Sequence, residues 1–397
     1  MAVAAPAVVV GAGANGLGVA RSLAREEVPV WLVDSDVRRP EMHTRAAIPV
    51  VVRSLRGETL VDELVRLATV RFPGLRPVLF LTQEESVKIV SRQRDRLSAL
   101  YHLRLPTVDM VDTLLHKQGF QRLAEELGSP VPSLVHVRTF ADLPAIGGLR
   151  YPVVIKPGER NSEYSRQFKK AYRAESAEDA DALLRGILAV MADVVVQEWI
   201  DGPDANIYFC LQYVGSQGQV IASFTGRKIR SWPPQVGGTA SCAPAPEVQE
   251  ELSAMTGRFF QSASVIGMAS MEYKRDARSG EFQMVEPTIG RTDYQEEVAT
   301  LNGVNLPYAA YCSELGQPFR ASAMKKRPVV WRVRSEDAQS AVAQGQRIKE
   351  GYPRGAHVTD ALWRWSDPLP YLVRNMRHAR HALHARASRM IAEAHRP

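Results

Sequence analysis

Short apolar runs separated by turn residues dominate the first third of the chain. Ala7–Val10 and Val30–Val33 are two such runs, and between them the glycine turn Gly11–Gly18 leads into an amphipathic helix over Val19–Arg25. The alternation continues to about residue 110 with two further apolar runs, Ala47–Val52 and Pro77–Leu81. Strands that alternate with helices are typical of a parallel sheet covered by helices on both faces. The pattern therefore predicts an N-terminal α/β domain.

A different pattern begins near Thr113, where a helical stretch, Lys117–Leu127, ends at Gly128 and two prolines. Three single strands are then expected, at Leu134–Val137, Pro152–Ile155 and Val194–Gln197. Two antiparallel hairpins follow, Asn206–Val214 with Val220–Thr225, and Ala269–Lys274 with Glu281–Glu286 around the turn Asp276–Gly280. This region is therefore expected to be α+β with antiparallel sheets.

Composition places the chain among ordinary globular proteins. It has 397 residues, of which 45% are hydrophobic and 23% charged, enough for about two to four domains with cores of their own. Three unpatterned cysteines indicate a reduced, cytoplasmic protein. No apolar stretch reaches the roughly 18 residues of a membrane-spanning helix. A net charge of +7 favours anionic small molecules and is too diffuse to indicate nucleic acid.

The glycine turn has two interpretations. Gly11, Gly13 and Gly16 follow a strand and open a helix, and Asp34 ends the next strand, which is the context of a dinucleotide site. The alternative is a tight turn that needs glycine for positive φ and for close helix packing. In that case the turn can still form the floor of a substrate pocket, because ligands bind at the carboxyl ends of parallel strands.

An ordered set of charged residues predicts a site for Mg-ATP. Lys117 opens a helix and Lys156 ends a buried strand, so both can neutralise a polyphosphate. Glu272 and Glu286 lie on the two strands of one hairpin, where carboxylates can hold Mg²⁺. If the hairpin is regular, Glu272 pairs with Met284, and Glu286 is its diagonal neighbour at about 7–8 Å.

This ordered set resembles the ATP-grasp superfamily, and within it the carboxylate–amine ligases. The resemblance covers roughly residues 113–315. It implies a Rossmann-like domain over 1–112, an ATP-grasp domain over 113–320 with lobes of about 113–198 and 199–320, and a C-terminal segment over 321–397. Relatives of this kind are often dimers, so the resemblance allows a homodimer, whereas the sequence itself does not show the oligomeric state.

The resemblance also implies roles for single residues. ATP phosphates are expected at Lys117 and Lys156, adenine at Gln197, Glu198 and Ile200, and the ribose at Asp204. One or two Mg²⁺ ions are expected at Glu272, Glu286 and Thr288, and the reacting phosphoryl and carboxylate groups at Arg291.

Three departures from the family pattern stand out. The flap after Lys156 is polar over 159–166, where the family has glycines. Thr288 replaces an asparagine of the metal motif, and a hydroxyl is a poorer Mg²⁺ ligand than an amide oxygen. Arg291 comes one residue later than usual.

Further residues are candidates for contacts with the substrates. Arg227 and Lys228 belong to a basic triplet that suits a triphosphate or an acyl phosphate, Lys228 as a catalytic cation and Arg227 as an ATP ligand. Gly238 and Thr239 lie in a small-residue loop whose N–H groups can bind a carboxylate or an oxyanion. Thr292 lies just past the metal motif and is expected to line the acceptor pocket.

The chain ends in a basic helix, Tyr371–Ala394. His378, His381 and His384 lie among its arginines without a nearby acid, which favours a solvated basic face over a zinc site. Peripheral contact with an anionic membrane is one expected use of such a helix.

The sequence therefore predicts an ATP-dependent ligase that joins a small carboxylate to an amine through an acyl phosphate. Two alternatives stay open. The Gly11–Gly16 turn allows a dinucleotide-dependent oxidoreductase, and the altered flap and Thr288 allow an ATP-binding module without catalysis.

Overall fold

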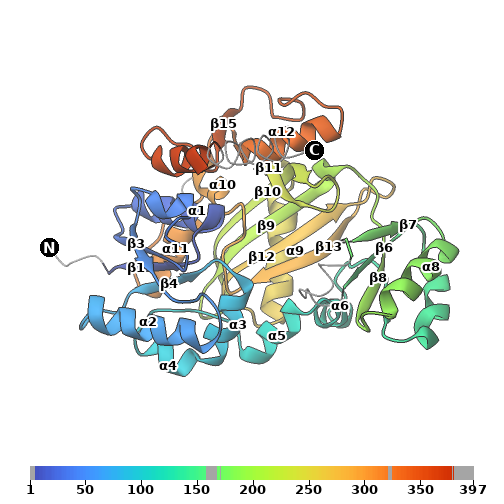
Figure 1. Ribbon diagram of the computed structural model, residues 1–397, viewed down its shortest axis with the longest axis horizontal. Helices are drawn as coiled ribbons and strands as arrows, with labels where there is room; N and C mark the ends of the chain where they lie inside the picture. Colours follow the sequence, from blue (N-terminus) through green and yellow to red (C-terminus); the bar gives the residue numbers. More distant parts are fainter. Residues whose placement is uncertain (1–4, 158–167, 170, 321–323, 378, 380–397) are drawn as a thin grey trace, which may run out of the picture.

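The computed structural model describes residues 5–157, 168–169, 171–320, 324–377 and 379, and these form three sheets with helices around them (Figure 1). The first sheet is parallel with strand order β3-β2-β1-β4. Its strands are β1 Ala7–Val10, β2 Val30–Asp34, β3 Ile48–Val51 and β4 Val78–Leu81.

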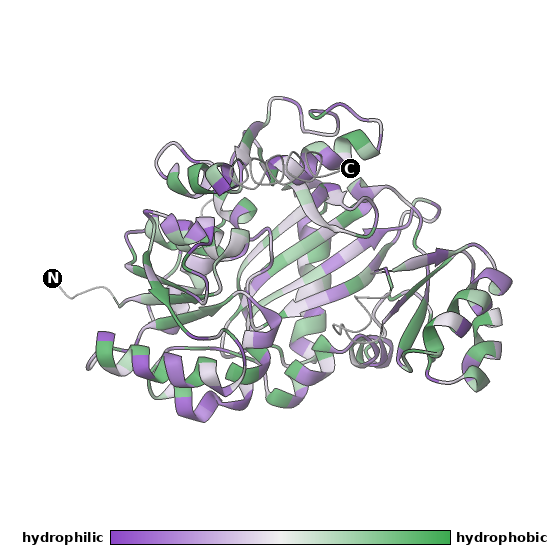
Figure 2. Cartoon of the chain, viewed as in Figure 1, coloured by the Kyte–Doolittle hydropathy of each residue, from purple (hydrophilic) through white to green (hydrophobic). Residues whose placement is uncertain are grey.

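Helices cover both faces of this sheet. Alternate residues of β1 enter two different cores: Val8 and Val10 pack with α2, whereas Ala7 and Val9 pack with α1. β1 and β4 are wholly apolar (Figure 2) because both of their faces are buried, whereas β3 is an edge strand with exposed residues. The helices of this region are α1 Gly13–Ala24, α2 Gly57–Arg71, α3 Glu84–Arg92 and α4 Arg94–Ser98, with the 3₁₀ turn η1 Pro40–His43. The predicted α/β domain is confirmed.

A larger sheet occupies the centre of the molecule, and within the described residues its strand order is β13-β12-β9-β10-β11-β14-β15. Its strands pair antiparallel except for β14 and β15. They are β9 Ile207–Val214, β10 Val220–Trp232, β11 Gly238–Pro244, β12 Gly267–Arg275, β13 Phe282–Ile289, β14 Val329–Arg332 and β15 His357–Asp360. Its helices are α9 Gln249–Ser262, α10 Glu297–Leu301, α11 Leu306–Glu314 and α12 Arg334–Ala343, with η3 Asp204–Asn206 and η4 Pro246–Val248.

A small antiparallel sheet with its own apolar core forms the third unit, at the right of Figure 1. Its strands are β5 Leu134–Val137, β6 Val153–Pro157, β7 Tyr172–Ala174 and β8 Val194–Glu198, in the order β5-β8-β6-β7. Helix α8 Ala177–Leu188 and η2 Phe140–Gly148 pack on it, and α5 Val108–Leu115 and α6 Lys117–Glu126 precede it. The antiparallel sheets predicted for this part of the chain are confirmed.

The predicted register of the last hairpin is wrong by one residue beside the turn, where Arg275 pairs with Phe282, and by two residues at Glu272. Glu272 pairs with Glu286, not with Met284, because a register shift follows and Tyr273 pairs with Met284. Val285 is therefore the extra residue of a β-bulge, which a regular alternation cannot reveal. The bulge brings the two carboxylates directly opposite each other.

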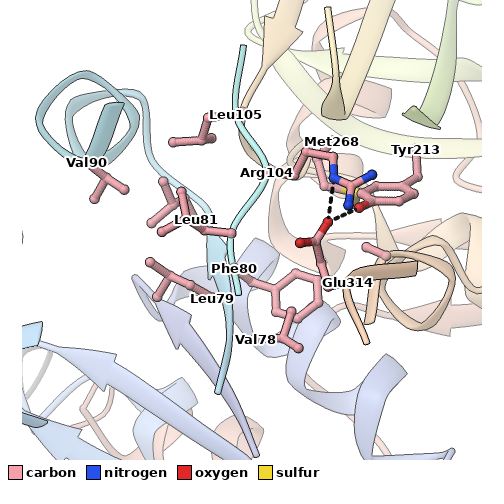
Figure 3. A pocket seen from close by; sticks show the side chains of 13 residues that line it. Val78, Leu79, Phe80, Leu81, Val90, Arg104, Leu105, Tyr213, Met268 and Glu314 are labelled. Carbon is pink, nitrogen blue, oxygen red and sulfur yellow. Dashed lines mark hydrogen bonds and ion pairs between the residues drawn. The ribbon is translucent and has the colours of Figure 1, made fainter. Parts of the chain in front are cut away.

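A buried polar network joins the N-terminal region to the central sheet (Figure 3). Arg104 Nε lies 2.8 Å from Glu314 Oε1, and the Tyr213 hydroxyl donates a hydrogen bond to the same oxygen. Burial, together with the charge of Glu314, raises the pKa of Tyr213. The adjoining cavity has a volume of about 30 Å³, about the share of one water molecule. The network is therefore a structural joint and not a substrate site.

The C-terminal helix is described only at residues 369–377 and 379. The rest of the predicted basic helix, with His378, His381 and His384, lies outside the described residues. Across the described ranges, none of the helices has both the length and the apolar character that crossing a bilayer requires.

Candidate functional site

A cavity of about 520 Å³ lies between the small sheet and the central sheet. Small-molecule sites occupy roughly 300–1,000 Å³, so a nucleotide fits this space. The small sheet contributes residues of β6 and β8, and the central sheet contributes β10, β12 and β13. Ten of the residues predicted from the sequence, or their loop neighbours, line it: Lys117, Lys156, Gln197, Glu198, Ile200, Lys228, Gly237, Gly238, Glu272 and Glu286.

The two predicted phosphate ligands lie on the same wall. Lys156 comes near the end of β6, and its Nζ donates a hydrogen bond of 2.7 Å to Gln197 Oε1 on β8. Gln197 in turn contacts Gln121 at 3.4 Å, which fixes its amide. Lys117 begins α6 and reaches the same cavity. This wall can therefore present two ammonium groups to a polyphosphate.

The strand end after β8 forms the next part of the wall. The carboxylate of Glu198 accepts a 2.9 Å hydrogen bond from the backbone N–H of Arg150. Trp199 follows, and Lys274 Nζ and the Arg173 guanidinium lie 4.5 and 5.1 Å from its ring centroid. Burial lowers the pKa of Lys274.

The sequence interpretation missed Trp199 and Lys274 as pocket residues. The available signal was the two-residue spacing of Glu272 and Lys274 on β12, which places both side chains on one face of the strand.

The opposite wall carries the two carboxylates. Lys228 Nζ lies 2.7 Å from Glu272 Oε2, and the exposed fractions of the two side chains are 6% and 28%. Burial acts to lower the pKa of Lys228, but the charge and hydrogen bond of Glu272, together with the charges of Asp293 and Glu286, offset it and the pKa is raised. The ammonium group of Lys228 thus partly neutralises the negative charge of the carboxylate pair, Glu272 and Glu286.

The carboxylate pair fits Mg²⁺. This ion is commonly held by one or two protein carboxylates and completes its shell with phosphate oxygens and water. Among the described residues there is no group of three or more His, Cys, Asp or Glu side chains that could hold a metal by itself. Thr288 is buried opposite Ser270 and is not among the residues lining the cavity. Glu272 and Glu286 are therefore the ligands that the geometry supports.

A narrower cavity of about 50 Å³ continues from the phosphate wall toward Arg291. It shares Lys117, Lys156 and Glu286 with the larger cavity. Arg291 Nη1 donates to the Thr292 carbonyl at 3.2 Å, but its buried Nε has no hydrogen-bond partner in the part of the chain that the structure describes. An anion in the narrow cavity would satisfy this group.

The glycine turn faces the same segment. Asn15 Nδ2 donates to the Thr292 carbonyl at 3.0 Å, and the Thr292 hydroxyl donates to Asn15 Oδ1 at 2.8 Å. Gly11 and Gly13 have φ of 93° and 68°, and a Cβ on Gly16 would lie 2.0 Å from the Gly11 carbonyl oxygen. The glycines are thus required by the turn itself, next to Thr292.

Asp34 is already engaged within the fold. Its carboxylate accepts from the backbone N–H of Ala12 at 2.9 Å and of Asp36 at 3.1 Å, and Arg39 Nε lies 3.1 Å away. A dinucleotide ribose would have to compete with all three. This arrangement favours the tight-turn interpretation.

Three other predicted residues lie away from the cavity surface. Asp204 is buried and accepts hydrogen bonds from the backbone N–H groups of Ser231 and Gln235. Arg227 precedes Lys228 on β10 and therefore points to the opposite face of the sheet. Thr239 is buried and donates to Gln295 at 3.1 Å. Asp204 and Thr239 hold the loop that carries Gly238.

Sequence and structure comparisons show which known proteins this chain is similar to. No protein-family model matches the chain. D-aspartate ligase from Enterococcus faecium (strain Aus0004) is 24% identical over 316 residues, which cover 75% of this chain and 74% of the relative.

Two solved structures give the fold independently. An ADP complex of N5-carboxyaminoimidazole ribonucleotide synthetase superimposes with a TM-score of 0.64 at 16% identity, over 86% of this chain and 85% of the other. The biotin carboxylase domain of 2-oxoglutarate carboxylase from Hydrogenobacter thermophilus, with MgADP and bicarbonate, superimposes with a TM-score of 0.61 at 12% identity, over 81% and 73%. The chain is similar to both in its mixed parallel and antiparallel architecture.

Proposed function

We propose that this chain, an ATP-grasp ligase of the carboxylate–amine type, activates the carboxylate of an amino acid or another small acid with ATP and transfers it to an amine. The observation that carries the proposal is one cavity in which Lys117 and Lys156 face the pair Glu272 and Glu286, with Arg291 just beyond. The similarity to D-aspartate ligase supports an amino acid as the carboxylate substrate.

The two lysines would hold the ATP phosphates, and adenine would lie toward Gln197, Glu198 and Ile200. Glu272 and Glu286 would hold Mg²⁺, which neutralises phosphate charge and aligns the leaving group. Lys228 adds a buried positive charge beside Glu272. The wall thus supplies charge neutralisation and positioning and no covalent step.

The reaction has two steps. A carboxylate oxygen attacks the γ-phosphorus, the bond to the β–γ bridging oxygen breaks, and ADP leaves with that electron pair. The amine nitrogen then attacks the acyl carbon and loses a proton, and phosphate leaves with the electrons of the C–O bond. Arg291 would hold the carboxylate and the phosphoryl group while both steps occur, a role supported by its position in the lining of the narrow cavity.

Turnover in the presence of hydroxylamine tests this proposal. Hydroxylamine replaces the unidentified amine and converts an acyl phosphate into a stable hydroxamate. We expect ADP and hydroxamate to form in equal amounts, only with Mg²⁺ and only with certain members of a panel of D- and L-amino acids and small dicarboxylic acids.

Two variants sharpen the test. Arg291→Ala should abolish hydroxamate formation while ATP still binds, and Arg354→Ala, an exposed arginine that lines neither cavity, should leave it unchanged. Tight ATP binding without ADP formation across the whole panel would instead support a nucleotide-binding module. Binding of NAD⁺ or FAD without binding of ATP would reject the ligase.

A further inference from the structure

A second large cavity, of about 730 Å³, lies on another part of the molecule. It is lined by the C-terminal end of α1, by β15 and by the segment Trp363–Asp367, and it shares no lining residue with the proposed ATP cavity. Arg25 lies one helix length from Gly13, which at 1.5 Å per residue is about 18 Å. The cavity is therefore separate from the glycine turn and from the acceptor segment beside it.

The acidic residues of this cavity are already engaged. Asp367 accepts from Arg21 Nε at 3.0 Å and from the Arg45 backbone N–H at 2.9 Å. Glu297 lies 2.7 Å from Arg364 Nη2 and also accepts from the indole of Trp331. Asp360 accepts from three backbone N–H groups, those of Arg334, Leu362 and Trp363. None of the three carboxylates is left to neutralise a further cation.

Three more cations line the same cavity, Arg25, Arg45 and Lys325. Their side chains are exposed, and within the described ranges none of them forms an ion pair or a side-chain hydrogen bond. Burial and the nearby charge of Arg25 lower the pKa of Lys325, which indicates that these two cations lie near each other. The cavity therefore carries an uncompensated positive charge.

An unusually exposed tryptophan lies at the same cavity. Trp365 is 88% exposed, although its ring centroid lies 5.2 Å from that of Trp363. An indole that presents a free face beside arginine and lysine side chains is suited to stacking on a planar ring that bears an anion.

We propose that this cavity is a second ligand site, for a small phosphorylated molecule that carries a planar ring. Arg25, Arg45 and Lys325 bind the phosphate, since guanidinium and ammonium groups are its usual partners. Trp365 stacks on the ring. The volume suits a molecule of the size of a mononucleotide and not a polymer.

Calorimetric titration with guanosine 5′-monophosphate, ribose 5-phosphate and guanosine tests the site. The full chain is first saturated with Mg²⁺ and a non-hydrolysable ATP analogue, so that the proposed ATP cavity is blocked. We expect guanosine 5′-monophosphate to bind at a 1:1 ratio, ribose 5-phosphate to bind more weakly, and guanosine to bind weakest.

Variants at exposed positions assign the contacts without disturbing the fold. The double variant Arg25→Ala/Lys325→Ala should lower the affinity for guanosine 5′-monophosphate and for ribose 5-phosphate about tenfold or more, because two charged contacts with the phosphate are lost. Trp365→Ala should lower the affinity for guanosine 5′-monophosphate about tenfold and leave the affinity for ribose 5-phosphate unchanged, because only the stacking contact with the ring is lost. The matched control Lys326→Ala changes an exposed neighbour that does not line the cavity, and should alter neither affinity.

Three results would overturn the proposal. They are no binding once the ATP cavity is blocked, equal binding of guanosine and its monophosphate, or a loss in Lys326→Ala as large as in the double variant. The outcome is independent of the ligase assay, because no residue of the proposed active site is changed and turnover is not measured.

Discussion

Lys228 and Glu272 show how one salt bridge can set the charge of a metal site. The two carboxylates of the pair Glu272 and Glu286 repel each other, and the buried ammonium of Lys228 offsets this repulsion from 2.7 Å. The raised pKa of Lys228 keeps it charged over the physiological range. At the proposed Mg²⁺ site, this charge would partly neutralise the two carboxylates beside the ion.

Replacing Lys228 by methionine removes this charge and keeps much of the volume. We expect kcat to fall about 10²- to 10³-fold, as for other losses of a preorganised charge. The Mg²⁺ concentration at half-maximal rate should also fall, because the two carboxylates then lack a competing cation. Steady-state kinetics with Mg²⁺ titration measure both quantities. Lys326→Met is the control, and an unchanged kcat in Lys228→Met would remove Lys228 from the reacting centre.

Glu296 makes stability depend on pH. Its side chain is buried, Oε1 has no hydrogen-bond partner among the described residues, and burial followed by the charge of Asp293 raises its pKa to about 8. Between its ordinary value of 4.5 and this value, the folded protein holds a proton that the unfolded chain has lost. Stability therefore falls as pH rises through this window, by at most about 1.4 kcal/mol per pH unit.

Glu296→Gln keeps the neutral shape and removes the titration. Thermal unfolding from pH 5 to pH 8 should show a shallower decline for this variant than for the wild type, and a higher melting temperature than the wild type at pH 8. Glu251→Gln, an exposed change on α9, should follow the wild type. Parallel curves for Glu296→Gln and the wild type would show that Glu296 is ionised in the folded protein.

At the scale of elements, the loop between β10 and β11 depends on one buried carboxylate. Asp204 accepts from the N–H groups of Ser231 and Gln235 at 2.9 and 2.8 Å and from Gln344 Nε2 at 3.2 Å. Gln235 and Gly238 line the proposed ATP cavity. Asp204 therefore shapes the cavity through the loop, whereas the family resemblance implies a contact with the ribose.

Asp204→Asn distinguishes these roles, because it removes one acceptor oxygen. If the residue anchors the loop, the affinities for ATP and for 2′- and 3′-deoxy-ATP fall by the same factor, and stability drops by about 1–3 kcal/mol. We expect this result in calorimetric titrations and thermal unfolding. A loss confined to ATP, with deoxy-ATP binding unchanged, would support the ribose contact.

The sequence pattern predicted most elements because their signals are local. The strands Ala7–Val10 and Leu134–Val137 have the bounds that were expected, since each is an apolar run between turn residues. The strand expected at Val220–Thr225 extends to Trp232, because its basic residues Lys228 and Arg230 are buried against acids and not exposed. Ion pairs between residues distant in the sequence cannot be predicted from the local alternation of apolar and polar residues.

The bulge at Val285 and the partners of Asp204 were unpredictable for the same reason. Both depend on pairing between segments that are distant in the chain. The sequence placed the lysines, the carboxylates and Arg291 in one site, and the structure brings these residues around two connected cavities. Their individual roles, the domain boundaries and the proposed membrane contact of the C-terminal helix stay predictions.

At the scale of the whole molecule, the two ends of the described chain are joined. Within the C-terminal segment that follows residue 320, β14 and β15 extend the central sheet beside β11. Arg21 on α1 donates to Asp367 and to the carbonyls of Ala361 and Leu362. The N-terminal helix is thereby fixed to the C-terminal segment.

Asp367→Ala tests this joint, because it leaves the buried guanidinium of Arg21 without its acid. Burial already lowers the pKa of Arg21 despite Glu297 and Asp367, so loss of Asp367 should destabilise the protein by about 3–5 kcal/mol. Hydrogen exchange should then show that amides of α1 and β15 lose protection together. The double variant Arg21→Met/Asp367→Leu removes both charges and should recover part of the stability. Loss of protection in β15 alone would mean that the C-terminal segment unfolds independently of α1.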